Sequence, residues 1–233
     1  MSDRRVAMVT GATGGLGRVL VPDLAADGWD LVLVGSSRER LDQLVADVGL
    51  DADRVEVVVA DLRDQAVAVA TVEAAYARFG RVDALAHLVG GWTGGMQVGR
   101  SPDDPYADMI GQHFWTSLNV VRELAPRMVD AGFGRIAAVS SPMAASPDAG
   151  MSAYGVGKAA QETLFAALAQ EVAGTGVTVN VVRVRAIDTS AGEEGSAEAY
   201  ATTPAEISAA IRYLFSDQAR VVNAQRIGLH SGV

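Results

Sequence analysis

Short runs rich in valine, alanine and leucine recur along the whole chain, and most of them lack a polar residue at every second position. Runs of this kind are typical of strands buried on both faces, as in parallel sheets. The pattern constrains the fold strongly, because a sheet covered on both faces needs helices between its strands. Seven strands are expected, at Arg5–Thr10, Asp30–Gly35, Arg54–Ala60, Ala84–Val89, Arg135–Ser140, Val177–Val184 and Arg226–His230.

The segments between these strands have the apolar spacing of helices. Their alternation with the strands predicts right-handed crossovers and an α/β fold, a doubly wound, seven-stranded parallel sheet of the Rossmann type. A chain of 233 residues without linker, repeat or low-complexity tract fits one such domain, residues 1–233. The expected helices are Leu16–Ala26, Arg38–Val48, Gln65–Phe79, Asp104–Ala131, Ala153–Ala173 and Pro204–Ser216.

The composition narrows the kinds of site and partner. The chain has no cysteine, which excludes thiolate chemistry and fits a reducing, cytoplasmic compartment. Its net charge is −9 and its basic residues are scattered, which argues against nucleic acid or a membrane as the main partner. No apolar run reaches the ~18 residues of a membrane span. The histidines at 87, 113 and 230 lack metal-ligand spacing, so no metal is expected. With nucleic acid and membrane disfavoured, the expected partner is a small-molecule substrate.

The first strand runs into a turn, Thr10–Gly17, that contains four glycines and opens a helix. Glycines let the backbone approach a pyrophosphate, and the free N–H groups of a helix N-terminus stabilise its charge. An isolated match can be an ordinary turn, but the position after the first strand favours a dinucleotide. Gly17 is expected to let helix and strand pack closely. The expected cofactor contacts are Gly11, Thr13, Gly14, Gly15 and Leu16.

The end of the second strand indicates which dinucleotide is bound. An acidic residue there would hold the ribose 2′-hydroxyl of NAD, but this chain has Gly35, Ser36, Ser37 and Arg38. Two hydroxyls and a guanidinium suit a 2′-phosphate, so NADP is favoured over NAD. The alternative is that Arg38 only begins a solvated helix and pairs with Asp42.

Two further strand ends border the same edge of the sheet, where ligands bind in open α/β folds. After the third strand, Asp61 and Leu62 are expected at the cofactor, with Asp61 accepting a hydrogen bond from the adenine amino group, although an aspartate here is also a common helix cap. After the fourth strand, residues 90–104 form a glycine-rich stretch, and Val89, Gly90 and Gly91 are expected to contact the cofactor.

Tyr154 and Lys158 lie four residues apart on an expected helix, so they share one face. A free phenol, with a pKa of about 10, is a poor base at neutral pH, but an adjacent ammonium favours the phenolate. Tyr154 can then exchange a proton with an alcohol or carbonyl as hydride moves. Ser141, at the end of the fifth strand, is placed to donate a hydrogen bond to the substrate oxygen.

Taken in this order, the motifs resemble those of the short-chain dehydrogenase/reductase family over essentially the whole chain. The matching residues are Thr10, Gly11, Gly15, Gly17, Asp61, Leu62, Ser141, Tyr154, Lys158, Asn180, Ile187, Asp188 and Thr189. The resemblance implies that Lys158 also holds the nicotinamide ribose, that Ile187 bonds the carboxamide through its backbone, and that Thr189 lies near the carboxamide and the pyrophosphate.

The chain also departs from the family pattern. His87-Leu88-Val89-Gly90 stands where the family usually has Asn-Asn-Ala-Gly, and Val184-Arg185 replaces Pro-Gly. His113 falls where the family has an asparagine that supports a proton relay. An imidazole with a titration near neutral pH could replace it, or His113 only fills space beneath the site.

The segment from Gly90 to Gly95, with Trp115-Thr116-Ser117 later, is similar to dihydropteridine reductases within the family. Trp92 is expected to stack on a flat substrate ring or to pack under the loop, and Met143 is a second candidate substrate contact. A short substrate lid is expected at residues 190–203. The absent acid at Gly35 and the presence of Ser141 argue against a pterin reductase.

Three functions therefore compete. The first is an NAD(P)-dependent oxidoreductase, such as a ketoreductase, that acts on a carbonyl or alcohol with Tyr154 as general acid/base. The second is reduction of a C=N bond in a pterin-like heterocycle. The third is a non-catalytic sensor or structural protein, which retention of Ser141, Tyr154 and Lys158 disfavours. Wide apolar arcs on helices 113–131 and 153–172 predict a homodimer or homotetramer.

Overall fold

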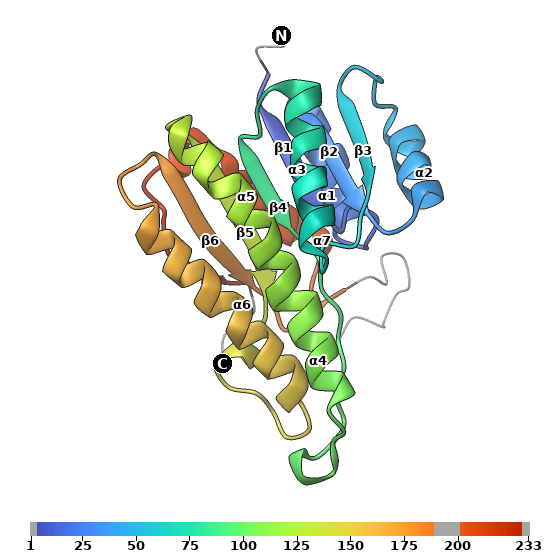
Figure 1. Cartoon of the computed structure of the whole chain (residues 1–233), viewed down its shortest axis with the longest axis vertical. Helices are drawn as coiled ribbons and strands as arrows, with labels where there is room; N and C mark the ends of the chain where they lie inside the picture. Colours follow the sequence, from blue (N-terminus) through green and yellow to red (C-terminus); the bar gives the residue numbers. More distant parts are fainter. Residues whose placement is uncertain (1–3, 189–200, 230–233) are drawn as a thin grey trace.

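Seven parallel strands form one sheet in the computed structural model, which describes residues 4–188 and 201–229 (Figure 1). Their order is β3-β2-β1-β4-β5-β6-β9. The chain adds strands on one side of β1 up to β3 and then on the other side from β4, which confirms the expected doubly wound α/β fold. A two-stranded sheet pairs β7 (Ala186–Ile187) with β8 (Ala201–Thr202). The strands of the main sheet are β1 (Val6–Thr10), β2 (Asp30–Gly35), β3 (Val55–Val59), β4 (Ala84–His87), β5 (Gly134–Ser140), β6 (Val177–Arg183) and β9 (Arg226–Gly228).

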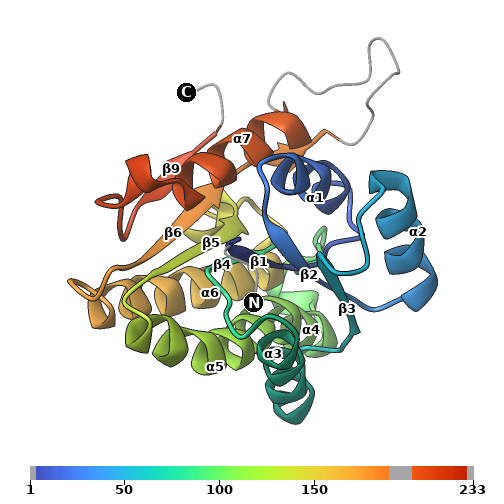
Figure 2. The same cartoon turned by 90° about the horizontal axis from the view of Figure 1, so that it is seen from above.

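Helices cover both faces of the sheet (Figure 2). One face is covered by α1 (Gly17–Ala26), α2 (Arg38–Val48) and α7 (Pro204–Phe215). The other is covered by α3 (Gln65–Phe79), α5 (Thr116–Asp130) and α6 (Ser152–Glu171). Within the described residues, no helix has the length and apolar character needed to cross a membrane.

The central strand β1 shows why these runs lack polar alternation. Val6 and Met8 belong to the core on one side of the sheet, whereas Ala7 and Val9 belong to the core on the other side. All four side chains are buried. Because burial of one large aliphatic side chain contributes about 1.5–3 kcal/mol, both faces of such a strand must be apolar.

Helix ends follow local signals in the sequence. Ser37 caps α2 by accepting a hydrogen bond from the backbone N–H of Arg40, and α2 ends at Gly49 with a φ of 69°. Asp64 caps α3 through the N–H groups of Ala66 and Val67. The cap of α3 is therefore Asp64, and the alternative that Asp61 is a helix cap is wrong.

The helix expected over Asp104–Ala131 is divided by a π-helical turn. It consists of α4 (Asp104–Ile110), a π turn at Gly111–Trp115, and α5. Two hydroxyls support this turn: Thr116 Oγ1 donates to the Gln112 carbonyl at 2.6 Å, and Ser117 Oγ donates to the His113 carbonyl at 2.5 Å. Side chains that bond the carbonyl four residues earlier compete with the helical ladder, and such π turns are frequent at functional sites.

Some expected boundaries shift. β4 ends at His87 rather than Val89, because the chain leaves the ladder after Leu88 N bonds Thr10 O. The last strand ends at Gly228, and His230 lies outside the described residues. Most of the lid expected at 190–203, and Thr189, also lie outside them. Of the expected lid, residues 201–202 form β8, and Thr203 is the N-cap of α7.

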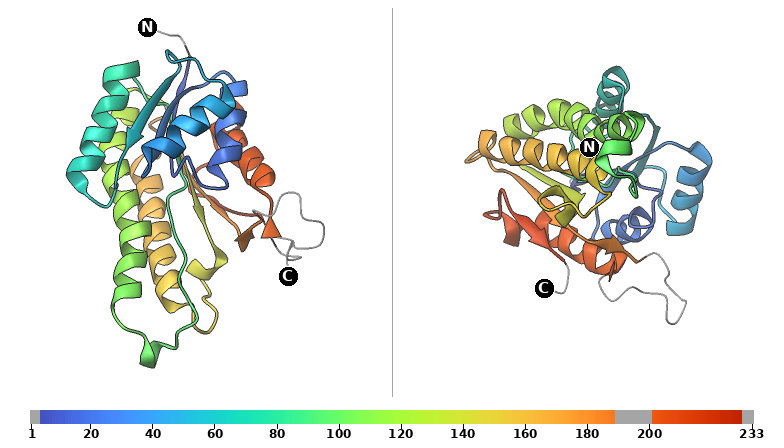
Figure 3. Two further views of the ribbon diagram at one scale, coloured as in Figure 1. Left: turned by 90° about the vertical axis from the view of Figure 1, so that its right-hand side faces the viewer. Right: turned by 90° about the horizontal axis from the view of Figure 1, so that it is seen from below.

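The carboxyl ends of β1, β4 and β5 meet at one edge of the sheet. Beyond this edge, α4 and the first turns of α6 run together, away from the N-terminus (Figure 3). The glycine-rich turn, the segment after β4, and the start of α6 therefore surround the same region. This is where an open α/β sheet binds its ligand.

Candidate active site

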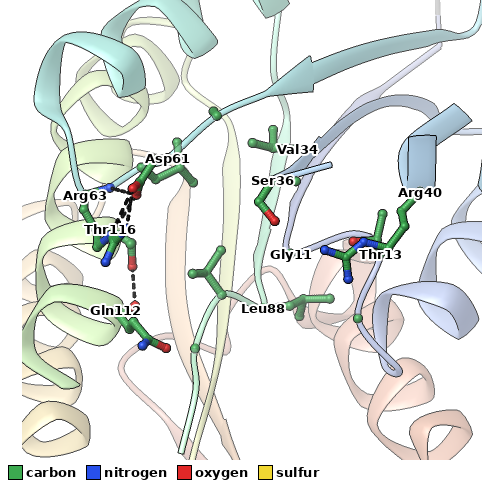
Figure 4. Close-up of a pocket in the computed structure, with 16 residues that line it drawn as sticks. Gly11, Thr13, Val34, Ser36, Arg40, Asp61, Arg63, Leu88, Gln112 and Thr116 are labelled. Carbon is green, nitrogen blue, oxygen red and sulfur yellow. Dashed lines mark hydrogen bonds and ion pairs between the residues drawn. The ribbon is translucent and has the colours of Figure 1, made fainter. Parts of the chain in front are cut away.

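The glycine-rich turn forms the floor of a cavity of about 450 Å³ (Figure 4). Gly11 has a φ of 73°, and its N–H, like that of Ala12, donates to the Val34 carbonyl. A Cβ on Gly11 would lie 3.1 Å from the backbone of Leu88 and Val89, and one on Gly17 would lie 2.2 Å from the Ala12 carbonyl oxygen. Glycine is thus required at both positions, and the close approach at Gly17 is between the helix and the Ala12 backbone of the turn, not between helix and strand.

The wall after β2 contributes Ser36 and Arg40 to this cavity. Figure 4 shows the Arg40 guanidinium beside Thr13, with the Ser36 hydroxyl nearby. Arg38 is not among the lining residues; its Nε donates to both oxygens of Asp42, at 2.9 and 3.0 Å. For Arg38, the geometry corresponds to the alternative of a solvated helix start, and Arg40 takes the position expected for Arg38.

The opposite wall carries Asp61 and Arg63. Three side-chain hydrogen bonds of 2.6–3.1 Å join them. Hydrogen bonding to Arg63 lowers the pKa of Asp61 below its ordinary value. Since Arg63 is already neutralised by this pair, Arg40 is the cation without a side-chain partner in the described part of this cavity.

A second cavity, of about 360 Å³, shares the wall Leu88–Gly90 with the first. It is lined by residues from the segment after β4, the π turn, the end of β5, α6 and β7, which the topology brings together at the sheet edge. Trp92 lies at this cavity with 65% of its surface exposed. Its lining includes Gly91, Trp92, His113, Val139, Tyr154, Lys158, Val184, Arg185 and Ile187.

Lys158 is the only lysine in the chain and is buried, with 5% exposure. Its Nζ donates to the Val139 carbonyl at 2.8 Å and to Gln161 Oε1 at 3.1 Å, and lies 6.0 Å from the centre of the Tyr154 ring. Burial lowers the pKa of Lys158 to about 7, against a smaller opposing effect of Glu162. In the protein without cofactor or substrate, the Lys158 amine therefore changes charge near neutral pH.

Tyr154 is hydrogen-bonded to Ser141, whose Oγ also accepts the Met143 N–H at 3.3 Å. Burial raises the pKa of Tyr154, and the bond to Ser141 opposes this only in part. The expectation that Lys158 makes this phenol acidic is wrong for the chain alone. The reason is that burial dominates, while the Lys158 amine donates to the Val139 carbonyl and to Gln161 instead of to the phenol.

His113 lies in the π turn and is buried. Its ring packs edge-to-face with the ring of Tyr154, and the two ring centres are 5.6 Å apart. Its Nε2 donates to the Gly91 carbonyl at 3.0 Å, so Nδ1 carries the lone pair, and this buried atom has no hydrogen-bond partner within the described residues. Burial and nearby Lys158 lower the pKa of His113 to about 3. The expected titration near neutral pH is therefore wrong, and the imidazole is a neutral hydrogen-bond acceptor.

Gly90 leaves space for this ring. A Cβ on Gly90 would lie 2.6 Å from His113 Cε1, 2.9 Å from its Nδ1 and 3.7 Å from Lys158 Nζ. The free imidazole nitrogen and the amine thus approach the same point beside the backbone of Gly90. A larger residue at this position would displace the His113 ring.

A second buried histidine supports the site from below. Thr10 Oγ1 bonds His87 Nδ1 at 2.9 Å, and Thr116 Oγ1 bonds its Nε2 at 3.3 Å. The hydrogen of Thr116 goes to the Gln112 carbonyl, so Nε2 donates to Thr116 and Nδ1 accepts from Thr10. Burial lowers the pKa of His87 to about 3.

The structure thus divides the expected site residues into groups. Gly15, Leu16, Ser37, Arg38 and Met143 line neither cavity, and Ser141 reaches the second one only through Tyr154. The sequence reasoning missed Arg40, Arg63, Gln112 and Gln161. The expected residues that line the first cavity are Gly11, Thr13, Gly14, Ser36, Asp61, Leu62, Val89 and Gly90.

Comparison with known proteins gives a consistent result. The family model described as short chain dehydrogenase matches residues 5–199. The chain is 29% identical to an acetoacetyl-CoA reductase of Acinetobacter sp. (strain RA3849), covering 100% of this chain and 99% of that protein. It is 26% identical to the 3-oxoacyl-(acyl-carrier-protein) reductase FabG of Thermotoga maritima, over 98% and 97% of the two chains. These relatives lend no support to the similarity to dihydropteridine reductases.

Solved structures show the same fold. Levodione reductase superposes with a TM-score of 0.89 at 25% identity, over 98% of this chain and 96% of that chain. NAD⁺-bound xylitol dehydrogenase, 22% identical, gives a TM-score of 0.87 over 98% of both chains. ElxO with NADP bound, 15% identical, gives 0.89 over 97% of both. The fold thus accommodates either cofactor.

Proposed function

The chain belongs to the short-chain dehydrogenase family, and from this premise we propose that it reduces a carbonyl compound with NADPH, Tyr154 acting as general acid. In the reverse direction Tyr154 acts as general base. One observation carries the proposal: Tyr154, Lys158 and His113 line one cavity that shares its Leu88–Gly90 wall with the cavity at the glycine-rich turn. A long dinucleotide could place its phosphates in one cavity and its nicotinamide in the other.

The residues present fit such a cofactor. The positive φ at Gly11 and its close approach to Leu88 leave a backbone surface without side chains at the helix N-terminus. Ser36 and Arg40 line the first cavity and would hold the adenosine ribose and its 2′-phosphate, and Asp61, on the opposite wall, would bind the adenine. By family resemblance, Ile187 and Thr189 would hold the carboxamide end.

The chain's own groups then divide the chemistry. When bound, the reduced nicotinamide supplies the hydride that the carbonyl carbon accepts. Tyr154 donates its phenolic proton to the carbonyl oxygen, which completes the alcohol. The Ser141 hydroxyl donates a hydrogen bond to the same oxygen. Because burial keeps the Tyr154 phenol protonated at neutral pH, the acid is in the state that reduction requires.

Lys158 and His113 serve the proton supply. By family resemblance, the ammonium of Lys158 would bind the ribose hydroxyls of the cofactor. His113 replaces the family's asparagine as a fixed acceptor. Its Nδ1, which has no partner among the residues that the structure describes, and Lys158 Nζ approach one point beside Gly90, so that a water there would bond both. With a pKa of about 3, His113 orients this water and does not carry the proton.

The substrate class follows from the relatives and the cavity. We infer a 3-oxoacyl thioester, the kind of substrate named for the acetoacetyl-CoA and 3-oxoacyl reductases. Val139, Val184 and Ile187 give the cavity an apolar lining for an acyl chain, and the exposed ring of Trp92 stands at its wall.

The test measures loss of reduced-nicotinamide absorbance with acetoacetyl-CoA, simple ketones and a quinonoid pterin. Turnover of acetoacetyl-CoA with NADPH supports the proposal. Turnover of the pterin alone would favour C=N reduction. Binding of NADPH, seen by tryptophan fluorescence, without turnover of any compound would favour a sensor.

Arg40→Ala is expected to weaken NADPH binding by about 10- to 100-fold and to leave NADH binding nearly unchanged. Arg40 is the cation without a side-chain partner in the described wall of the first cavity, and a charge-assisted hydrogen bond contributes about 1.5–3 kcal/mol. Fluorescence titration with each cofactor gives the two dissociation constants.

Arg38→Ala is the matched control, because it removes the same charge two residues earlier. Arg38 pairs with Asp42 and is 67% exposed, so its loss should change neither constant. Equal weakening of both cofactors by Arg40→Ala would contradict a 2′-phosphate site.

We also propose that the chain forms a homodimer or homotetramer through the face of α5 and α6. These helices form an outer layer (Figure 2), and Trp115 and Val156 beside it are 46% and 43% exposed. Large apolar side chains exposed on a helical layer are typical of subunit contacts. Light scattering at micromolar concentration should give a mass of two or four chains, and a monomer mass would contradict this assembly.

A further inference from the structure

Lys158 is held by a buried chain of hydrogen bonds through Gln161 and Ser117, here called the polar arm, which has no role in the proposed reaction. Gln161, one turn later on α6, is fully buried. Its Oε1 accepts from Lys158 Nζ at 3.1 Å, and its Nε2 donates to Ser117 Oγ at 3.1 Å. Ser117, also fully buried, lies on α5 beside the π turn.

The hydrogen bonds of this arm run in one direction. Ser117 Oγ donates its only hydrogen to the His113 carbonyl, at 2.5 Å. It must therefore accept from the Gln161 amide nitrogen, which fixes the amide oxygen towards the amine. The π turn supplies the carbonyl at the end of the arm, so the break in the helix and the position of Lys158 are connected.

We propose that Gln161, oriented by Ser117, is a positioning residue that holds the Lys158 ammonium at the site and supports its charge. The inference rests on the proposed function, in which Lys158 acts as a cation. A neutral amide oxygen stabilises the ammonium by hydrogen bonding without cancelling its charge. An apolar side chain would leave the buried charge with one acceptor fewer.

Other groups also face the amine and must be counted. Glu162, on the same helix, favours the charged form. His87 from β4 and His113 from the π turn are neutral near pH 7, since their pKa values are about 3. Tyr154 is protonated there. Among the described residues, Gln161 is thus the neutral side chain that accepts a hydrogen bond directly from Lys158 Nζ.

The chain offers a direct measurement, because Lys158 is its only lysine. Protein grown with [ε-¹³C]lysine gives one lysine signal, whose shift against pH reports the pKa of Lys158 without any turnover. Gln161→Leu should lower the midpoint by about one pH unit, and Gln161→Glu should raise it by about one unit or more. Gln170→Leu, an exposed glutamine on the same helix, should leave it unchanged.

Kinetics provide the second readout. If the ammonium is needed for reduction, the alkaline limb of kcat should move with the midpoint, down in Gln161→Leu and up in Gln161→Glu. KM for the carbonyl substrate should change little. A merely structural role would lower stability without moving either pH value.

The inference is overturned if both Gln161 variants titrate at the wild-type midpoint. Should Gln161→Leu not fold, Gln161→Glu and Ser117→Ala decide by the same criterion, with a smaller downward shift expected for Ser117→Ala. Absence of turnover in the wild type would refute the proposed function alone, because the lysine titration is independent of catalysis.

Discussion

Tyr154→Phe is expected to lower kcat for carbonyl reduction by about 10²- to 10⁴-fold, the usual contribution of a positioned general acid. Only the hydroxyl is lost, so the ring remains against His113 and the cavity keeps its shape. NADPH binding should change little, because the cofactor's phosphates and adenosine are held elsewhere. Stopped-flow absorbance of the reduced nicotinamide measures the hydride step directly.

Tyr213→Phe provides the matched control, since Tyr213 lies on α7 and is 49% exposed. It should retain wild-type kcat. Full activity in Tyr154→Phe would exclude the phenol as the acid. Loss of NADPH binding in the same variant would instead show that the change disturbs the site as a whole.

The pH profile adds a directional test of the same role. Burial raises the pKa of Tyr154, so the phenol is protonated through the neutral range. Reduction needs the protonated phenol, so deprotonation of Tyr154 should lower its rate only at a pH above the range in which Lys158 titrates. Oxidation of the alcohol needs the phenolate and should rise with pH over the same range.

The architecture could be predicted well because its causes are local and repeated. A strand such as β1, apolar on both faces, has no stable place except inside a covered parallel sheet. Caps such as Ser37 and terminal glycines such as Gly49 mark helix ends. The π turn was not predictable from periodicity, because it depends on Thr116 and Ser117 bonding carbonyls one turn earlier.

The candidate site could be predicted only in part, and the errors concern electrostatics. Spacing places Tyr154 and Lys158 on one face, but not how deeply each is buried. Burial sets the pKa of Lys158 and His113 and reverses the expected shift of Tyr154. The choice between Arg38 and Arg40 depended on helix geometry: Asp42 lies one turn after Arg38 and takes its guanidinium.

The protein is expected to lose about 4 kcal/mol of unfolding free energy between about pH 7 and about pH 5. His87 and His113 titrate in the fold at a pKa of about 3, lowered from 6.5 by burial. Between these values the unfolded chain binds more protons than the folded one, so stability falls as pH falls. Each histidine contributes about 2 kcal/mol between pH 7 and pH 5, because its slope rises to the full value of about 1.4 kcal/mol per pH unit only below its ordinary pKa.

Between about pH 7 and about pH 5, the effect of the histidines on stability can be measured apart from that of the carboxylates. Glu162 and Glu206 have pKa values lowered from 4.5, and Asp61 from 3.8. Their contributions are present above the ordinary value and are lost only as pH falls below it. Urea unfolding followed by circular dichroism at fixed protein concentration, at several pH values above about 5, therefore reports mainly the buried imidazoles.

Single replacements assign the effect. His87→Asn and His113→Asn should each halve the pH-dependent loss, whatever they cost in stability at neutral pH, because asparagine binds no proton. Added salt should change the loss little, since screening acts on exposed charges far more than on buried ones. An unchanged slope in both variants would mean that these rings are protonated inside the fold. Nδ1 of His113 could not then be the neutral acceptor that the proposed proton supply requires.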